Sequence, residues 1–263
     1  MPNQNCAHRF INTLKKMDLY SDAHVHLNDR MQSILPTYPI TAILSCSTPQ
    51  QCNNAKQFIQ RYPNMEMSCG IHPWHANDVK WEEMLPWLQQ TTIIGEIGMD
   101  SVWCTIDLQS QKNIFIKQLA FASYYHKPVV LHTKGMEKEI LDLIRQYPNH
   151  YHVHWYSCPD YIEEYRALNC YFSIGPFPFI DENVKKVVEL VPLNRLLIET
   201  DGIEAAEWAM HQSLNNDAYL SILKRTAKEI ATIKNKPVEE ILYQTKYNLL
   251  KFLSIKAKEN TAL

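Results

Sequence analysis

Histidine and carboxylate side chains follow short apolar segments along most of this chain. They are His24, His26, His72, Glu96, His132, His154 and Asp201. Imidazole nitrogens and carboxylate oxygens are common protein ligands of Zn²⁺, Mn²⁺ and related divalent cations. If the fold gathers these segments at one face, their side chains could form a metal centre that activates water for hydrolysis.

The apolar segments have the length of strands in a parallel sheet, and amphipathic segments separate most of them. The expected strands cover residues 19–25, 40–46, 65–71, 92–97, 128–131, 152–154, 170–174 and 196–198. Helical periodicity is clearest at residues 108–125, 137–147, 183–190, 216–233 and 238–253, with helix starts at Asp181 and Pro237 and a loop within 171–179. Eight strands alternating with helices predict an α/β protein, a (β/α)8 TIM barrel, whose functional side chains lie at the carboxyl ends of its strands.

Length and charge agree with one barrel and restrict its substrates. The 263 residues suit a single (β/α)8 domain over 1–263, with an N-terminal extension at 1–17, amphipathic over 6–16, and a polar tail at 255–263. The formal net charge is −2, so the chain has no overall positive field that would attract polyanions. A phosphate-bearing substrate would therefore be held by metal ions and a few local side chains.

Composition also bears on the expected compartment. The seven cysteines are scattered and contain no Cys-x-x-Cys pair, which is typical of reduced thiols. The sequence shows neither a signal-peptide apolar block nor an apolar run of 18 residues. We therefore expect a cytoplasmic protein that does not enter a membrane.

The first histidine pair lies in the expected first strand. Side chains two residues apart point to the same face of a strand, so His24 and His26 could bind one cation. By the same alternation we expect Asp22 on that face, as a further ligand or as a carboxylate that supports the ligands. A His-x-His pair is by itself also common as a surface or core feature.

Glu96 lies between isoleucines in the expected fourth strand. A buried carboxylate needs a strong positive partner, and its two oxygens allow it to bridge two cations. An ion pair with a lysine or arginine is the alternative. His132 and His154 follow the next two strands, and together with Glu96 they favour ligands over ordinary core histidines. His152 competes with His154, but the barrel mouth favours the later residue.

Asp201 follows the expected eighth strand, which lies beside the first strand once a barrel closes. Asp201 could therefore reach the cation bound by the first histidine pair and act as a base for a water molecule. A helix N-cap is the alternative role. Glu199 is expected to be buried, and its role as a ligand or as a support stays open.

Eight short strings occur in the order found in one known family. They are DAHVH from Asp22, GIHPW from Gly70, GEIGMD from Gly95, PVVLH from Pro128, HWYS from His154, YFSIG from Tyr171, ETD from Glu199 and YN from Tyr247. Each string is weak alone, but the ordered set, covering residues 18–253, is specific. It resembles the TatD-type metal-dependent hydrolases, a deoxyribonuclease family of the amidohydrolase-like superfamily.

The resemblance implies two divalent metal ions, Zn²⁺, Mn²⁺ or Mg²⁺, and hydrolysis of nucleic acids, notably DNA by 3′–5′ exonuclease action. Carried over by position, one metal would be held by His24, His26, Glu96 and Asp201, and the other by Glu96, His132 and His154. Glu96 and Asp201 would carry the catalysis, with Asp201 as the base. His72, together with Lys134, would contact the substrate phosphate.

Two departures from the family pattern fall at the expected substrate rim. Lys134 and Gly135 stand where the family commonly has Arg and Asp, and a lysine lacks arginine's bidentate contact with phosphate. The segment Gly202–Glu207 replaces a Ser-Pro pair, and we expect an acidic turn there, with Glu204 and Glu207 repelling long polyanions.

Three functions remain open at this point. The first is a deoxyribonuclease that acts on short or single-stranded DNA ends. The second is a metal-dependent hydrolase of another phosphoester, ester or amide. The third is a complex-forming subunit with a vestigial site. The sequence leaves the oligomeric state open.

Overall fold

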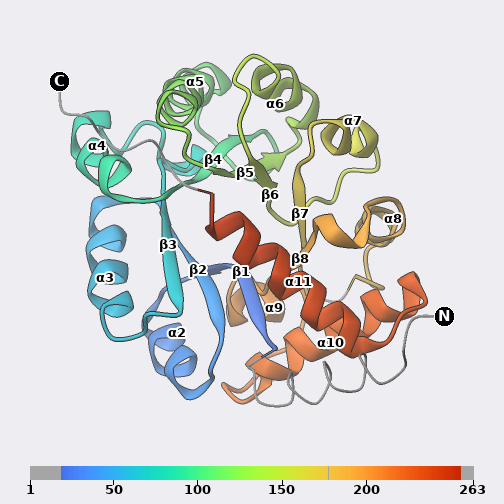
Figure 1. The fold of residues 1–263 in the computed structure, drawn as a ribbon. Coiled ribbons are helices and arrows are strands. Elements are labelled where there is room, and N and C mark those ends of the chain that lie inside the picture. Colours follow the sequence, from blue (N-terminus) through green and yellow to red (C-terminus); the bar gives the residue numbers. More distant parts are fainter. Residues whose placement is uncertain (1–18, 177, 256–263) are drawn as a thin grey trace.

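A computed structural model describes residues 19–176 and 178–255 (Figure 1). Within these ranges eight parallel strands form one sheet in the order β1 to β8. The strands are β1 (Ser21–His26), β2 (Thr41–Cys46), β3 (Met65–Cys69), β4 (Ile93–Asp100), β5 (Val129–Lys134), β6 (Tyr151–Val153), β7 (Tyr171–Ile174) and β8 (Leu196–Ile198). The amide of Asp201 donates to the carbonyl of His24 at 3.0 Å, which joins the two ends of the sheet. The predicted (β/α)8 TIM barrel is confirmed.

Helices surround the barrel, and most of them cover its outer face (Figure 1). They are α2 (Asp29–Ile34), α3 (Pro49–Ile59), α4 (Trp81–Gln90), α5 (Leu108–Tyr125), α6 (Glu137–Ile144), α7 (Ile162–Ala167), α8 (Glu182–Leu190), α9 (Ile203–Met210), α10 (Ala218–Lys234) and α11 (Val238–Leu253), with short 3₁₀ turns η1 (Leu35–Thr37), η2 (Pro73–His75) and η3 (Leu193–Arg195). α5 and α11 have their predicted bounds. Asp181 caps α8 as expected, because its carboxylate accepts from the Asn183 amide at 2.8 Å.

Two strands extend further than the sequence suggested. β4 continues to Asp100 and β5 to Lys134, and their pairing keeps Gly98 opposite His132. A Cβ atom on Gly98, whose φ is +157°, would lie only 1.9 Å from the His132 carbonyl oxygen. Glycine at this position thus allows the close pairing of β4 and β5, and His132 lies within its strand rather than after it.

α11 closes one end of the barrel. Its Leu249 and Phe252 pack against an inner apolar cluster, to which six strands contribute Ala23, Ile43, Ile93, Val130, Tyr171 and Leu197. In Figure 1 this red helix runs across the barrel. Because apolar side chains seal this end, the polar residues at the carboxyl ends of the strands occupy the opposite face.

A β-bulge changes the expected arrangement of β1. Asp22 pairs with Ala42 but Val25 pairs with Leu44, so β1 has one extra residue over this interval. Strict alternation is lost, and the expectation that Asp22 shares the face of the histidine pair was wrong. Its carboxylate instead accepts hydrogen bonds from the Thr200 amide and the Tyr219 hydroxyl, at 3.0 and 2.9 Å.

The six cysteines within the described ranges are free thiols. Among the helices that the structure describes, none is long and apolar enough to cross a membrane. The predicted N-terminal extension and all of the predicted tail beyond residue 255 lie outside the described residues.

Candidate metal centre

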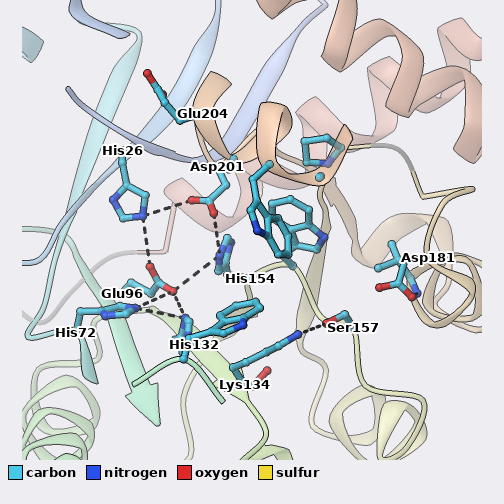
Figure 2. A pocket seen from close by; sticks show the side chains of 18 of the residues that line it. His26, His72, Glu96, His132, Lys134, His154, Ser157, Asp181, Asp201 and Glu204 are labelled. Atoms are coloured by element: carbon cyan, nitrogen blue, oxygen red, sulfur yellow. Dashed lines mark hydrogen bonds and ion pairs between the residues drawn. The ribbon is translucent and has the colours of Figure 1, made fainter. Parts of the chain in front are cut away.

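The Glu96 carboxylate lies at the centre of a histidine cluster at the open end of the barrel (Figure 2). Its Oε1 atom is 2.6 Å from Nδ1 of His132, 3.5 Å from Nε2 of His72 and 3.8 Å from Nε2 of His154. Its Oε2 atom is 3.2 Å from Nε2 of His24 and 3.7 Å from Nε2 of His26. Five histidines, from β1, β5 and the segments that follow β3 and β6, thus converge on one carboxylate that is only 1% exposed.

Asp201 extends this cluster from the end of β8. Its Oδ1 atom lies 3.3 Å from Nε2 of His26 and 3.6 Å from Nε2 of His24, and its Oδ2 atom lies 3.8 Å from Nε2 of His154. Asp201 is not a helix N-cap, because Gly202 occupies that position of α9. The structure therefore brings all six predicted ligands together.

Among the residues that the structure describes, three groups of donor atoms are compact enough to hold a metal ion. They are His24 with His154 and Asp201, His24 with His26 and Glu96, and His72 with Glu96 and His132. The grouping differs in part from the one that the family resemblance implies. His154 stacks on His24 with ring centroids 3.9 Å apart, and His72 lies closer to Glu96 than expected for a residue that only contacts substrate.

A hydrogen bond from the backbone distinguishes His72 from the other histidines of the cluster. Nδ1 of His72 accepts a hydrogen bond from the Trp74 amide at 3.2 Å. In the neutral ring the proton must then be on Nε2, the nitrogen that faces Glu96 and His132. A protonated Nε2 donates a hydrogen bond and offers no lone pair to a cation. This geometry favours the predicted substrate contact for His72 over metal ligation.

The protonation states of Glu96 and His24 suit metal binding. Burial acts to raise the pKa of Glu96, but the nearby imidazoles of His72 and His154 hold it well below its usual range. Burial also keeps the pKa of His24 well below that of a free histidine. An ionised carboxylate and a neutral imidazole are the forms that bind cations. Within the described residues Glu96 has no ion pair with lysine or arginine, and Asp201 Oδ1 is buried without a hydrogen-bond partner.

Two histidines are supported by carboxylates on the side away from Glu96. Nε2 of His132 lies 3.0 Å from Oδ2 of Asp100, which also accepts from the Trp74 indole at 2.8 Å. Nδ1 of His154 lies 3.0 Å from Oε1 of Glu199, which is fully buried. Burial alone would lower the pKa of His154, but Glu199, Glu96 and Asp201 together raise it to about 10. Carboxylates behind histidine ligands orient the ring and increase its basicity, so the position of Glu199 favours support of His154 over direct ligation.

The sequence strings contained Asp100 and Glu199 but gave them no definite role. The signal for each was its place at the end of a strand beside a histidine strand. His152 is also buried, but its Nε2 lies 2.6 Å from the Ser173 hydroxyl, deeper in the barrel than His154. The expected preference for His154 at the mouth agrees with this arrangement.

The cluster forms the floor of an open cleft of about 1220 Å³. Among the described residues that line it, Lys134 is the single lysine or arginine. Its ammonium group donates to the Ser157 hydroxyl at 3.1 Å and lies 4.4 Å from the centre of the Trp103 ring. Figure 2 shows Lys134 and Ser157 to one side of the histidine cluster. Lys134 is therefore placed to contact a substrate in the cleft.

The expected acidic turn after Asp201 is wrong in two respects. Residues from Ile203 onwards form α9, so the segment is a helix. Glu207 does not line the cleft, because its Oε1 atom accepts from the Arg30 guanidinium at 3.1 Å and from the Leu214 amide at 2.8 Å. Glu204 does line the cleft, and Arg30 lies 3.7 Å from its carboxylate. Arg30, distant in the sequence, thus offsets much of the acidic charge.

A (β/α)8 barrel with this cluster at its carboxyl-terminal face defines the protein as a metal-dependent hydrolase. The family described as TatD related DNase matches residues 21–254, and the chain belongs to this family. The family assignment made from the ordered strings is confirmed.

Related proteins agree with this class. The chain is 28% identical over 214 residues to the "Uncharacterized metal-dependent hydrolase YabD" of Bacillus subtilis, covering 76% of this chain and 82% of the relative. It is 24% identical over 200 residues to the human "3'-5' RNA nuclease TATDN2", covering 71% of this chain but only 26% of that protein. The crystal structure of YJJV, a TatD homologue from Escherichia coli K12, has a TM-score of 0.76 at 18% identity and covers 89% of this chain and 98% of its own, which shows the shared fold.

Proposed function

We propose that this hydrolase is a nuclease, specifically a deoxyribonuclease of the 3′–5′ exonuclease type that acts on short or single-stranded DNA. The observation that carries the proposal is the convergence of five histidines on Glu96 at the floor of an open cleft. The family's description as a DNase and the human relative's name as a 3′–5′ RNA nuclease support the same chemistry.

In this proposal His24, His26, Glu96, His132, His154 and Asp201 are the metal ligands. Divalent cations bound there would lower the pKa of water and offset negative charge on a phosphoryl oxygen. Glu96, with its two oxygens facing different histidines, is the ligand placed to serve both parts of the cluster. Two cations are proposed because the donor groups divide on the two sides of this carboxylate.

Asp201 is the proposed base. Burial raises the pKa of its carboxyl group to about 6, so it is mostly ionised at neutral pH and can still accept a proton. It would take a proton from water as the water oxygen bonds to phosphorus. The phosphorus–oxygen bond to the leaving oxygen then breaks, and that oxygen receives the proton that Asp201 took. His72, through its Nε2 proton, and Lys134, through its ammonium group, would contact the phosphate oxygens.

The charge of the cleft limits the substrate. Among the described residues that line the cleft, Lys134 is the single lysine or arginine. Three acidic residues, Asp181, Glu182 and Glu204, line the same space. Long duplex DNA gains much of its affinity from many phosphate contacts, which this cleft does not offer. Short or single-stranded ends therefore fit best.

The same acidic lining favours a second candidate, a hydrolase of a small phosphoester or another small ester. Such a substrate needs only one cationic contact beside the metal centre. Lys134 could supply that contact alone.

One experiment separates the two candidates. Protein freed of metal by chelation would be supplied with Zn²⁺, Mn²⁺ or Mg²⁺ and incubated with end-labelled single-stranded DNA, duplex DNA, RNA and a panel of small esters. Asp201→Asn is the matched inactive control. We expect stepwise shortening of single-stranded DNA from its 3′ end, faster than that of duplex DNA and absent in the variant. Turnover of small esters without cleavage of any nucleic acid would refute the nuclease proposal.

A further inference from the structure

Two exposed indole rings meet at the cleft that contains the metal centre. Trp103, between β4 and α5, is 48% exposed, and Trp208, on α9, is 61% exposed. Their ring centroids lie 5.8 Å apart at an interplanar angle of 82°, and both side chains line the cleft. We propose that Trp103 and Trp208 form a stacking platform for the bases of a single-stranded nucleic acid. The inference rests on the proposed nuclease function and identifies residues that select its substrate.

The exposure of these rings is unusual for a structural role. Large aromatic side chains contribute most to stability when they are buried. Here two separate elements place indoles together on the surface, beside the proposed reaction site. Because the two rings are nearly perpendicular, a flat group that stacks on one indole is also nearly perpendicular to the other indole. Nucleobases are flat groups of suitable size, and aromatic side chains bind them with little dependence on sequence.

The neighbouring cation extends the match from a base to a nucleotide. The Lys134 ammonium group lies over the Trp103 ring, 4.4 Å from its centre, so a cation and an aromatic surface adjoin in the cleft. In a single strand each base lies next to a phosphate group, so a nucleotide could contact the indole with its base and the ammonium group with its phosphate. With one lysine and no arginine among the described lining residues, phosphate contacts alone offer little affinity. Stacking can provide the remaining part, and it favours unpaired bases over a duplex.

The other two indoles of the cleft have different surroundings. Trp74 donates from its indole nitrogen to Asp100 at 2.8 Å, so it supports the carboxylate behind His132. Trp155 lies against Gly175, where an added Cβ atom would be 2.3 Å from the indole ring. These contacts make Trp74 and Trp155 part of the cleft wall. Trp103 and Trp208 are therefore the pair to test.

The test measures binding without cleavage. A fluorescently labelled single-stranded DNA pentamer and an abasic pentamer with the same backbone would be titrated with metal-free protein in the presence of a chelator. The variants are Trp103→Ala, Trp208→Ala, their double variant, and Trp103→Phe with Trp208→Phe. Tyr124→Ala is the matched control, because Tyr124 is 66% exposed on α5 and does not line the cleft.

We expect the double alanine variant to weaken binding of the base-containing pentamer about tenfold, which corresponds to about 1.4 kcal/mol. Binding of the abasic pentamer should change less than about twofold, since stacking needs a base. The phenylalanine variants should retain most of the affinity, and Tyr124→Ala should match the wild type. Far-ultraviolet circular dichroism would show that each variant is folded.

Equal loss for both pentamers would overturn the platform, because it would locate the effect in backbone contacts. No loss for either pentamer, or no saturable binding by the wild type, would overturn it as well. Cleavage assays distinguish this failure from failure of the proposed function. A wild type that binds in a base-dependent way but never cleaves would refute the nuclease and support the platform. A protein that cleaves both pentamers equally with and without the indoles would do the reverse.

Discussion

Asp22 offers a test of how the joint between β1 and β8 supports the proposed centre. Its carboxylate accepts from the amides of His24 and Thr200 at 3.3 and 3.0 Å, and from the hydroxyls of Thr200 and Tyr219. β1 carries two candidate ligands, and the segment after β8 carries Asp201. We therefore expect Asp22→Ala to reduce both stability and metal affinity, whereas Asp22→Asn should change either only slightly.

The hydrogen bonds that Asp22 accepts give the magnitude of the expected loss of stability. Hydroxyl groups can rotate toward other partners, but the two backbone amides cannot. An unsatisfied buried donor costs about 1–3 kcal/mol, so Asp22→Ala should lower the free energy of unfolding by roughly 4 kcal/mol. Asparagine keeps one oxygen that can accept from the amides, and it carries no charge. It therefore avoids the cost of burying a carboxylate, the effect that raises the pKa of Asp22 to about 7. Its cost should be about 1 kcal/mol or less.

Thermal unfolding and metal titration would check both effects. At about 2–4 °C per kcal/mol for a chain of this size, Asp22→Ala should lower Tm by roughly 10 °C and Asp22→Asn by less than about 4 °C. Residues that orient metal ligands typically change affinity about 10–100-fold, which we expect for Mn²⁺ binding to the alanine variant. Equal Tm values for the two variants, or wild-type Mn²⁺ affinity in Asp22→Ala, would refute the reasoning.

Three further predictions concern the cleft. Glu96→Gln should reduce metal content to fewer than two ions per chain by elemental analysis, because it removes the charge between the two donor groups; two retained ions would disprove the bridging role. Asp201→Asn should reduce the rate of hydrolysis at least about 100-fold while cations still bind at Glu96 and His132, and near-normal turnover would exclude Asp201 as the base. Lys134→Ala should raise KM for an oligonucleotide more than it lowers kcat, whereas Lys134→Arg should keep KM near the wild-type value. An unchanged KM in the alanine variant would show that Lys134 does not bind substrate.

The barrel itself could be predicted from the sequence for a simple physical reason. Buried parallel strands are short apolar runs, and the helices between them show their own periodicity, so each element leaves a local signal. Barrel closure then brings the ends of β1 and β8 together whatever the details. This is why residues as distant as His24 and Asp201 could be expected side by side.

Details that depend on contacts between distant segments could not be predicted. The bulge in β1 turned Asp22 away from the histidines, and strict alternation contains no sign of it. The charge of Glu207 suggested a repulsive rim until the structure placed Arg30 beside it. Each outcome depends on which side chain occupies a few ångströms of space, and sequence spacing does not encode that.

The sequence by itself determined the fold class and the family and supplied the candidate metal ligands, because these follow from the types and order of residues along the chain. Tertiary structure decided what each residue faces. It turned the His72 proton toward Glu96 by a bond from the Trp74 amide, and set Glu199 behind His154. It also joined Trp103 and Trp208 at the cleft. Hydrogen-bond direction and ring contact act over a few ångströms, so only the folded chain could settle them.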